Sequence, residues 1–95
     1  MGFFNAMRCT GKMNNLLKET ENQLRKISDL IQYGANQDRL QQEVKFLDTL
    51  RKEMVLVLDN SAGARVATYT FLGQKTRSLN VIMFLKDIIQ ELNQK

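Results

Sequence analysis

Apolar residues return at helical spacing through most of this chain. Between residues 13 and 31 they recur every three or four positions, and Thr20 is the only interruption. The members of this stripe are Met13, Leu17, Leu24, Ile27 and Ile31. Such spacing gives a helix one apolar side, which must be buried against a neighbour. We therefore predict a long helix over about 13–33 that ends at Gly34, because glycine readily takes the left-handed conformation that closes a helix.

Two later segments carry wider apolar stripes. A second helix is predicted over about 37–58, with Asn36 as its N-cap, and a last helix over about 78–92. The apolar positions of the second helix are Leu40, Val44, Leu47, Met54 and Leu58, flanked by Phe46, Leu50 and Val57. Those of the last helix are Leu79, Ile82, Leu85, Ile89 and Leu92, widened by Met83, Phe84 and Ile88. Both sets exceed what one seam between two helices can hide.

Residues 62–76 allow two interpretations. The run 64–72 is rich in β-branched and aromatic residues, which favours a strand, and it could form a hairpin with 54–58. The same segment also fits a short helix over about 62–73 that ends at Gly73. We favour the helix, because an isolated two-stranded ribbon is marginally stable and 54–58 continues a helical pattern.

Together these elements predict an all-α protein. The expected architecture is an antiparallel bundle of three long helices plus one shorter helix, because the connection at 34–36 is short. The chain contains no proline, so glycine and turn residues set the breaks. With Gly11 as a break, we divide the 95 residues into an N-terminal arm over 1–12 and one helical domain over 13–95.

Composition excludes several classes of protein. The chain is 43% hydrophobic and 25% charged, which is typical of a globular domain and not of a disordered one. It has no apolar run near the roughly 20 residues that a membrane span requires. Residues 1–6 are followed by Arg8, whereas a secretory signal carries its charge before a longer apolar stretch. We therefore expect a cytoplasmic protein.

The residues that usually carry catalysis or bind metals are scarce. There is no histidine, which excludes a Ser-His-Asp or Cys-His arrangement, and Cys9 is the only cysteine, which argues against a zinc site. The carboxylates Glu43, Asp48 and Glu53 alternate with lysines and arginines, as on a solvated helix face. We expect no catalytic, cofactor or metal site, and no enzyme activity.

The net charge of +4 is unevenly spread along the chain. Residues 60–86 contain four basic side chains and no acidic one. Arg65, Lys75 and Arg77 lie near two aromatic residues there, and such a group can contact phosphates. One hypothesis is therefore a small nucleic-acid-binding protein that uses these three residues.

The leading hypothesis is a protein-interaction or self-associating structural module, because the apolar stripes exceed a single seam. Its partner would be a second copy, giving a homo-oligomer, or another helical protein. The expected contact residues are Phe46, Leu50, Met83, Phe84 and Ile88.

A weaker hypothesis is a peripheral membrane protein. Phe3, Phe4 and Met7 would enter the bilayer surface, and the bases that follow them would lie at the headgroups.

Overall fold

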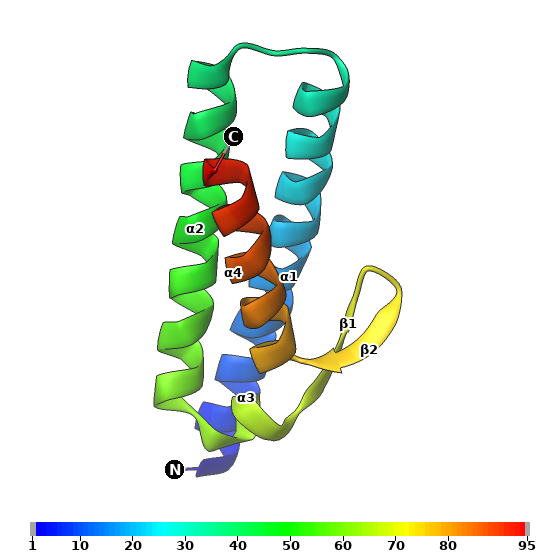
Figure 1. Cartoon of the computed structure of the whole chain (residues 1–95). Helices are drawn as coiled ribbons and strands as arrows, with labels where there is room; N and C mark the ends of the chain where they lie inside the picture. The colour runs from blue at the N-terminus through cyan, green and yellow to red at the C-terminus, as the bar shows by residue number, and fades with distance from the viewer. Residues whose placement is uncertain (1, 95) are drawn as a thin grey trace.

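The computed structural model describes the backbone of residues 2–94 and the side chains of residues 8–94. Its long elements are the helices α1 (Gly2–Gln32), α2 (Gln37–Asn60) and α4 (Ser78–Asn93). Between α2 and α4 come a short helix and two antiparallel strands: α3 (Ala62–Val66), β1 (Thr68–Phe71) and β2 (Gln74–Arg77). The helices lie side by side and the hairpin stands beside them (Figure 1). A helical bundle is therefore confirmed, although the protein is not strictly all-α.

The bundle is built around α2. This helix packs along both α1 and α4, whereas α1 and α4 scarcely approach one another. The turn between α1 and α2 follows the prediction: Gly34 has a φ of 72°, and Asn36 Oδ1 accepts a hydrogen bond from Arg39 N at 2.8 Å. This cap fixes where α2 begins.

The predicted break at Gly11 is wrong. α1 begins at Gly2 and passes through Gly11, so it starts well before the expected position near 13. A glycine inside a helix costs about 1 kcal/mol relative to alanine. Burial of Met13, Leu16 and Leu17 just after it can offset that cost. No boundary therefore separates an arm from the helix at this point.

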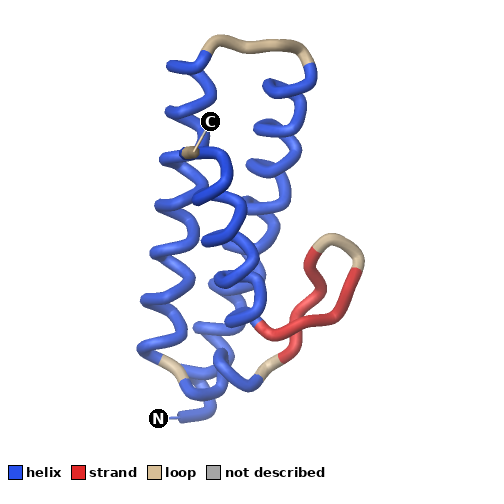
Figure 2. Tube along the Cα trace, in the orientation of Figure 1, coloured by secondary structure: helices blue, strands red, loops and turns tan. Residues whose placement is uncertain are grey.

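The predicted helix over 62–73 is correct only as far as Val66. From Thr68 the chain forms a hairpin, marked red in Figure 2, with Thr68 opposite Arg77 and Phe71 opposite Gln74. The strand partner is therefore the segment that follows, and not 54–58, which stays within α2. Strand geometry prevails because its two-residue period places Tyr69 and Phe71 on one buried face.

Contacts with the bundle support this otherwise marginal hairpin. The Tyr69 hydroxyl donates to the carbonyl oxygen of Ala64 at 3.2 Å, and Ser78 Oγ lies 3.4 Å from the same oxygen. The ring of Phe71 meets that of Phe84 edge-on, with centroids 6.4 Å apart. Tyr69, within the hairpin, and Ser78, the first residue after it, thus both contact the carbonyl oxygen of Ala64 in α3.

The core follows the predicted stripes with a few exchanges. Thr20, the interruption in the first stripe, is fully buried, and its hydroxyl donates to the carbonyl oxygen of Leu16 at 2.7 Å. Leu79 was expected in the last stripe but is exposed, and Val81 is buried instead. The core residues are Met13, Leu16, Leu17, Ile27, Val44, Leu47, Leu50, Met54, Val57, Leu58, Ala64, Tyr69, Phe71, Val81, Ile82, Leu85 and Ile89.

The two tyrosines allow a test of the tie between the hairpin and α3. Tyr69→Phe removes one of the two hydroxyls that reach Ala64, and we expect it to lower the free energy of unfolding by about 1 kcal/mol. Tyr33→Phe is the matched control, because Tyr33 is 81% exposed. Urea denaturation of both variants measures the difference, and equal losses would contradict the role given to Tyr69.

Candidate interaction surface

The described residues offer no metal or membrane-spanning feature. Among them, no three His, Cys, Asp or Glu side chains come together in a way that could hold a metal ion. None of the helices they form combines the length and apolarity needed to cross a bilayer.

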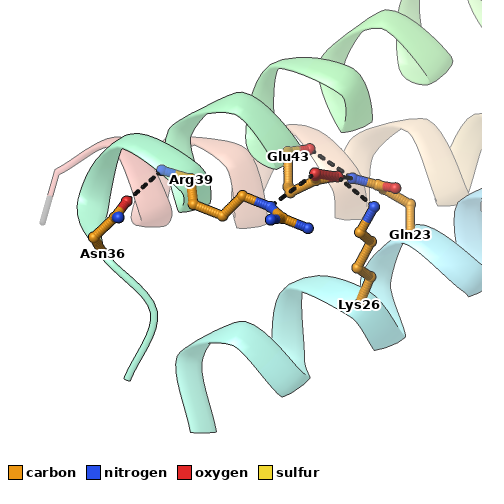
Figure 3. A network of polar contacts seen from close by, with 5 residues as sticks. All are labelled: Gln23, Lys26, Asn36, Arg39 and Glu43. Atoms are coloured by element: carbon orange, nitrogen blue, oxygen red, sulfur yellow. Dashed lines mark hydrogen bonds and ion pairs between the residues drawn. The ribbon is translucent and has the colours of Figure 1, made fainter. Parts of the chain in front are cut away.

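Glu43 on α2 is the centre of a polar network that joins α2 to α1 (Figure 3). Gln23 Nε2 donates to Glu43 Oε1 at 3.0 Å and to the Glu43 carbonyl oxygen at 2.8 Å. Lys26 Nζ lies 3.3 Å from Oε1, and Arg39 Nε lies 3.6 Å from Oε2. The hydrogen bond from Gln23 lowers the pKa of Glu43 most; burial opposes this, and Lys26 and Arg39 lower it further. This carboxylate has a structural role.

Asp48 is held in a similar way on the other side of α2. Arg51 lies 3.0 Å from Oδ1 and Lys52 lies 3.3 Å from Oδ2. Burial raises the pKa of Asp48, but the bonds from Arg51 and Lys52 outweigh it, so the pKa is lowered. Among the described residues, the groups that shift the pKa of Glu43 and of Asp48 include no second carboxylate.

The predicted partner-contact residues do not form one surface. Leu50 is 2% exposed and belongs to the core, so it is not a surface contact residue. It lies on the side of α2 that faces into the bundle. Phe46 on α2 and Met83 on α4 are exposed, but neither lines a hollow shared with Phe84 or Ile88. Phe84 and Ile88 lie one turn apart on the same side of α4.

Ile88 lines a hollow between α4 and the C-terminal half of α1, which we call the aliphatic hollow. Its volume is about 350 Å³. Five aliphatic side chains line it, with Ser28 and Gln32 at the edge. These five are Leu24, Ile27, Ile31, Ile88 and Leu92.

Phe84 lines a second hollow, between α4 and the hairpin, which we call the aromatic hollow. Its volume is about 210 Å³, and its apolar residues are Phe71, Leu72, Val81 and Phe84. Phe84 and Ile88, one turn apart on α4, also line a third hollow, whose other residues are the polar Asp87, Gln90, Glu91 and Gln94. We call the aliphatic and aromatic hollows together the apolar groove.

The three basic residues predicted to bind phosphates have different roles. Arg65 Nε donates to the carbonyl oxygen of Leu58 at 2.9 Å and so braces the link between α2 and α3. Lys75 and Arg77 lie two residues apart on β2, opposite Thr70 and Thr68 respectively. All four of these strand residues are exposed, on the face of the hairpin away from the buried Tyr69 and Phe71. Within the described part of the chain neither cation has an ion-pair partner.

Phe3, Phe4 and Met7, predicted to insert in a membrane surface, have side chains outside the described residues. Their backbone belongs to the first turns of α1.

The chain matches no known protein-family model, and it has no significant match among curated proteins or solved structures. The surface itself therefore carries the functional argument.

The sequence did not lead us to predict that Leu72 is exposed and has a positive φ. It is the first of the two turn residues of the hairpin and has a φ of 52°, next to Gly73 at 80°. A Leu-Gly pair between two short alternating segments is the available signal, because hairpin turns of this kind require a positive φ at both positions. Ile31 was assigned to the first stripe, but it is 52% exposed because it lies beside a hollow.

The Glu43 network predicts a pH dependence of stability. Because folding lowers the pKa of Glu43, its contribution is complete above the unfolded pKa, near 4.5, and is lost as the pH falls through the lower folded value. Glu43→Gln should therefore be less stable than the parent at neutral pH, with a difference that shrinks on acidification. Glu53→Gln, at an exposed site on the same helix, is the control. Urea denaturation at neutral and acid pH measures both, and a constant difference for Glu43→Gln would contradict the assignment.

Proposed function

We propose that the protein is a protein-interaction module that binds another polypeptide through the apolar groove. The observation that carries this proposal is a pair of hollows, one on each side of α4, that apolar side chains of α1, the hairpin and α4 line. Exposed apolar surface of this kind is typical of binding sites and costs free energy when left in water. The aliphatic hollow lies between two helices, which suits an extended apolar ligand such as an amphipathic helix.

Support for the proposal also comes from what the bundle leaves open. α4 packs on α2 and does not close onto α1, so Leu24 and Ile31 keep apolar surface that no element of the described chain covers. Leu72 and Phe84 are large apolar residues at 55% and 43% exposure on the same groove. The groove thus keeps two of the five residues expected from the sequence, Phe84 and Ile88.

A dye that fluoresces on apolar surfaces tests the groove directly. We expect anilinonaphthalene sulfonate to bind the dilute, folded protein, and Ile31→Glu to reduce that binding severalfold, because a carboxylate would then lie in the aliphatic hollow. Leu56→Glu is the matched control, since Leu56 is 60% exposed on α2 and lines neither hollow. Circular dichroism checks that the variants are folded. No dye binding by the folded parent, or equal effects of the two variants, would refute the proposed site.

The outer face of the hairpin favours a second candidate function, binding of nucleic-acid phosphates. Lys75 and Arg77 point the same way beside Thr68 and Thr70, which gives two cations and two hydroxyl donors without an acidic neighbour on either strand. Hydroxyl and basic side chains of this kind make phosphate contacts. Arg65 does not join them, because it is bonded to Leu58.

Salt dependence tests this second candidate. If two phosphates are neutralised, the logarithm of the association constant should fall with that of the salt concentration with a slope of about −2. The double change Lys75→Gln with Arg77→Gln should abolish the shift in anisotropy of a labelled duplex at low salt. Lys86→Gln, exposed on α4, should leave it unchanged. Binding that survives the double change would remove the hairpin face from consideration.

A further inference from the structure

The edge of β2 that faces away from β1 carries backbone groups that the hairpin does not use. Phe71 and Gln74 flank the two-residue turn, so they form a hydrogen-bonded pair. Hydrogen-bonded and non-hydrogen-bonded pairs alternate along an antiparallel ladder. Lys75 and Arg77 therefore take non-hydrogen-bonded positions, so their N–H groups and the carbonyl group of Lys75 point away from β1. Within the described part of the chain, these three groups have no hydrogen-bond partner.

This edge of β2 is also open. Three of the four residues of β2 are exposed, and the hairpin stands beside the helices (Figure 1). β1 lies against α1, whereas the helix that β2 approaches is α4, which follows it in the chain. A row of free donors and acceptors at the edge of a sheet can pair with one more strand. The free edge of β2 is therefore a site for an extended polypeptide segment.

The side chains of β2 restrict which segment can pair there. Lys75 and Arg77 are exposed on the outer face of the hairpin. If β2 of a second copy paired with this edge, cations would lie beside cations, which is unfavourable. Acidic side chains in the same places would be attracted instead, and neither strand of the hairpin has an acidic residue of its own. The charge of the edge therefore favours an acidic segment over a second copy of this chain.

Two acidic residues near the hairpin lie away from this edge. The carboxylate of Glu21 on α1 accepts a hydrogen bond from Leu72 N in the turn, at 2.7 Å. Asp87 on α4 lines the third hollow and not the aromatic one. Neither acid forms an ion pair with Lys75 or Arg77, so both cations stay available to a partner.

The inner face of β2 borders the aromatic hollow. Gln74 and Thr76 line this hollow together with Phe84, which is 43% exposed. Successive residues of a strand point to opposite faces. In a strand added beside β2, the residues next to Lys75 and Arg77 would thus point outward, and the residues between them would point toward the aromatic hollow.

On the basis of the proposed function, we propose that the polypeptide partner pairs an extended segment antiparallel with β2, and that this segment alternates acidic and apolar residues. Its acidic side chains lie beside Lys75 and Arg77, and its apolar side chains enter the aromatic hollow beside Phe84. Backbone hydrogen bonds hold the segment, and the alternation provides specificity. A shift by one residue would move every acidic side chain to the apolar face, so the register is defined.

A short labelled peptide that alternates glutamate and valine tests the proposal by fluorescence anisotropy. We expect it to bind the parent protein. A peptide with the same residues in two blocks keeps the composition and charge but loses the alternation, and it should bind at least about tenfold more weakly. Equal binding of the two peptides would overturn the proposal.

N-methylated peptides test the strand pairing itself. In the antiparallel arrangement the glutamates opposite Lys75 and Arg77 direct their N–H groups toward β2, whereas the valines direct theirs away. Methylation of the glutamate nitrogens should therefore weaken binding at least about tenfold, and methylation of the valine nitrogens is the matched control. Binding that tolerates methylated glutamates as well as methylated valines would refute the pairing.

Variants of Lys75 test the same hydrogen bond from the protein side. Lys75→Gln removes the charge, and Lys75→Pro removes the charge and the N–H group that points away from β1. Proline is tolerated at such edge positions, and circular dichroism checks the fold. Lys75→Pro should bind the alternating peptide severalfold more weakly than Lys75→Gln. Equal affinities of the two folded variants would contradict the proposed bond.

Charge reversal tests the acidic preference. The double change Lys75→Glu with Arg77→Glu should prefer a lysine–valine peptide to the glutamate–valine one, whereas Lys86→Glu on α4 should keep the parent preference. An unchanged preference in the double variant would overturn the proposal. Binding of a nucleic-acid duplex, with both peptide orders bound alike, would overturn it too and would favour the phosphate-binding candidate.

The proposed function and the strand pairing can fail separately. Ile31→Glu disrupts the aliphatic hollow and should leave binding of the alternating peptide unchanged, because Ile31 does not line the aromatic hollow. If the parent protein binds the dye in its groove but not the alternating peptide, the strand pairing is refuted and the groove remains.

Discussion

The packing of α2 against two helices at once is the constraint on which the rest of the molecule depends. Four of its buried side chains, Val44, Leu47, Leu50 and Met54, are at most 2% exposed, and the helix packs on α1 and α4 together. Since both neighbours pack on α2 and their backbones scarcely approach each other, a hollow remains between them. The groove is therefore a consequence of how the core is shared among three helices. The hairpin, on the other side of α4, forms a second hollow with that helix.

The long helices could be predicted because their stripes repeat over many turns, and so could the turn at Gly34 and the cap at Asn36. Prediction from local patterns was wrong where the helical period and the strand period fitted the same residues. The spacing of Val66, Tyr69 and Leu72 fits one side of a helix, whereas that of Tyr69 and Phe71 fits one face of a strand. The neighbouring sequence does not decide between the two. The choice depends on the bond from Tyr69 to Ala64 and on the contact of Phe71 with Phe84, which join the first strand to α3 and to α4. At Gly11 the predicted break is wrong, because burial of the residues that follow outweighs the cost of a glycine within the helix.

Exposed apolar side chains could be predicted from the sequence, but their positions only in part. An excess of apolar residues predicts that some of them stay exposed on the bundle, yet it does not say which face the bundle leaves open. Leu50 and Ile88 looked alike in sequence, but Leu50 is buried and Ile88 borders a hollow because α4 lies along one side of α2 only. The role of Arg65 could not be predicted from its charge either. Its hydrogen bond to the carbonyl oxygen of Leu58 depends on how the chain between these two residues folds.

The contacts that hold the hairpin bear on how the proposed surface would bind. An apolar residue on a mobile loop loses conformational entropy when it enters a partner, and this loss weakens binding. Here the turn is braced by Glu21 on α1, and the strands by Tyr69 and Phe71, so much of that entropy is already lost on folding. The strain at Leu72 is met in the same way, because the contacts that fix the strands leave the turn no relaxed alternative. Folding energy from the aromatic contacts thus maintains an unfavourable backbone conformation at the one place where it presents a large apolar side chain beside an open hollow.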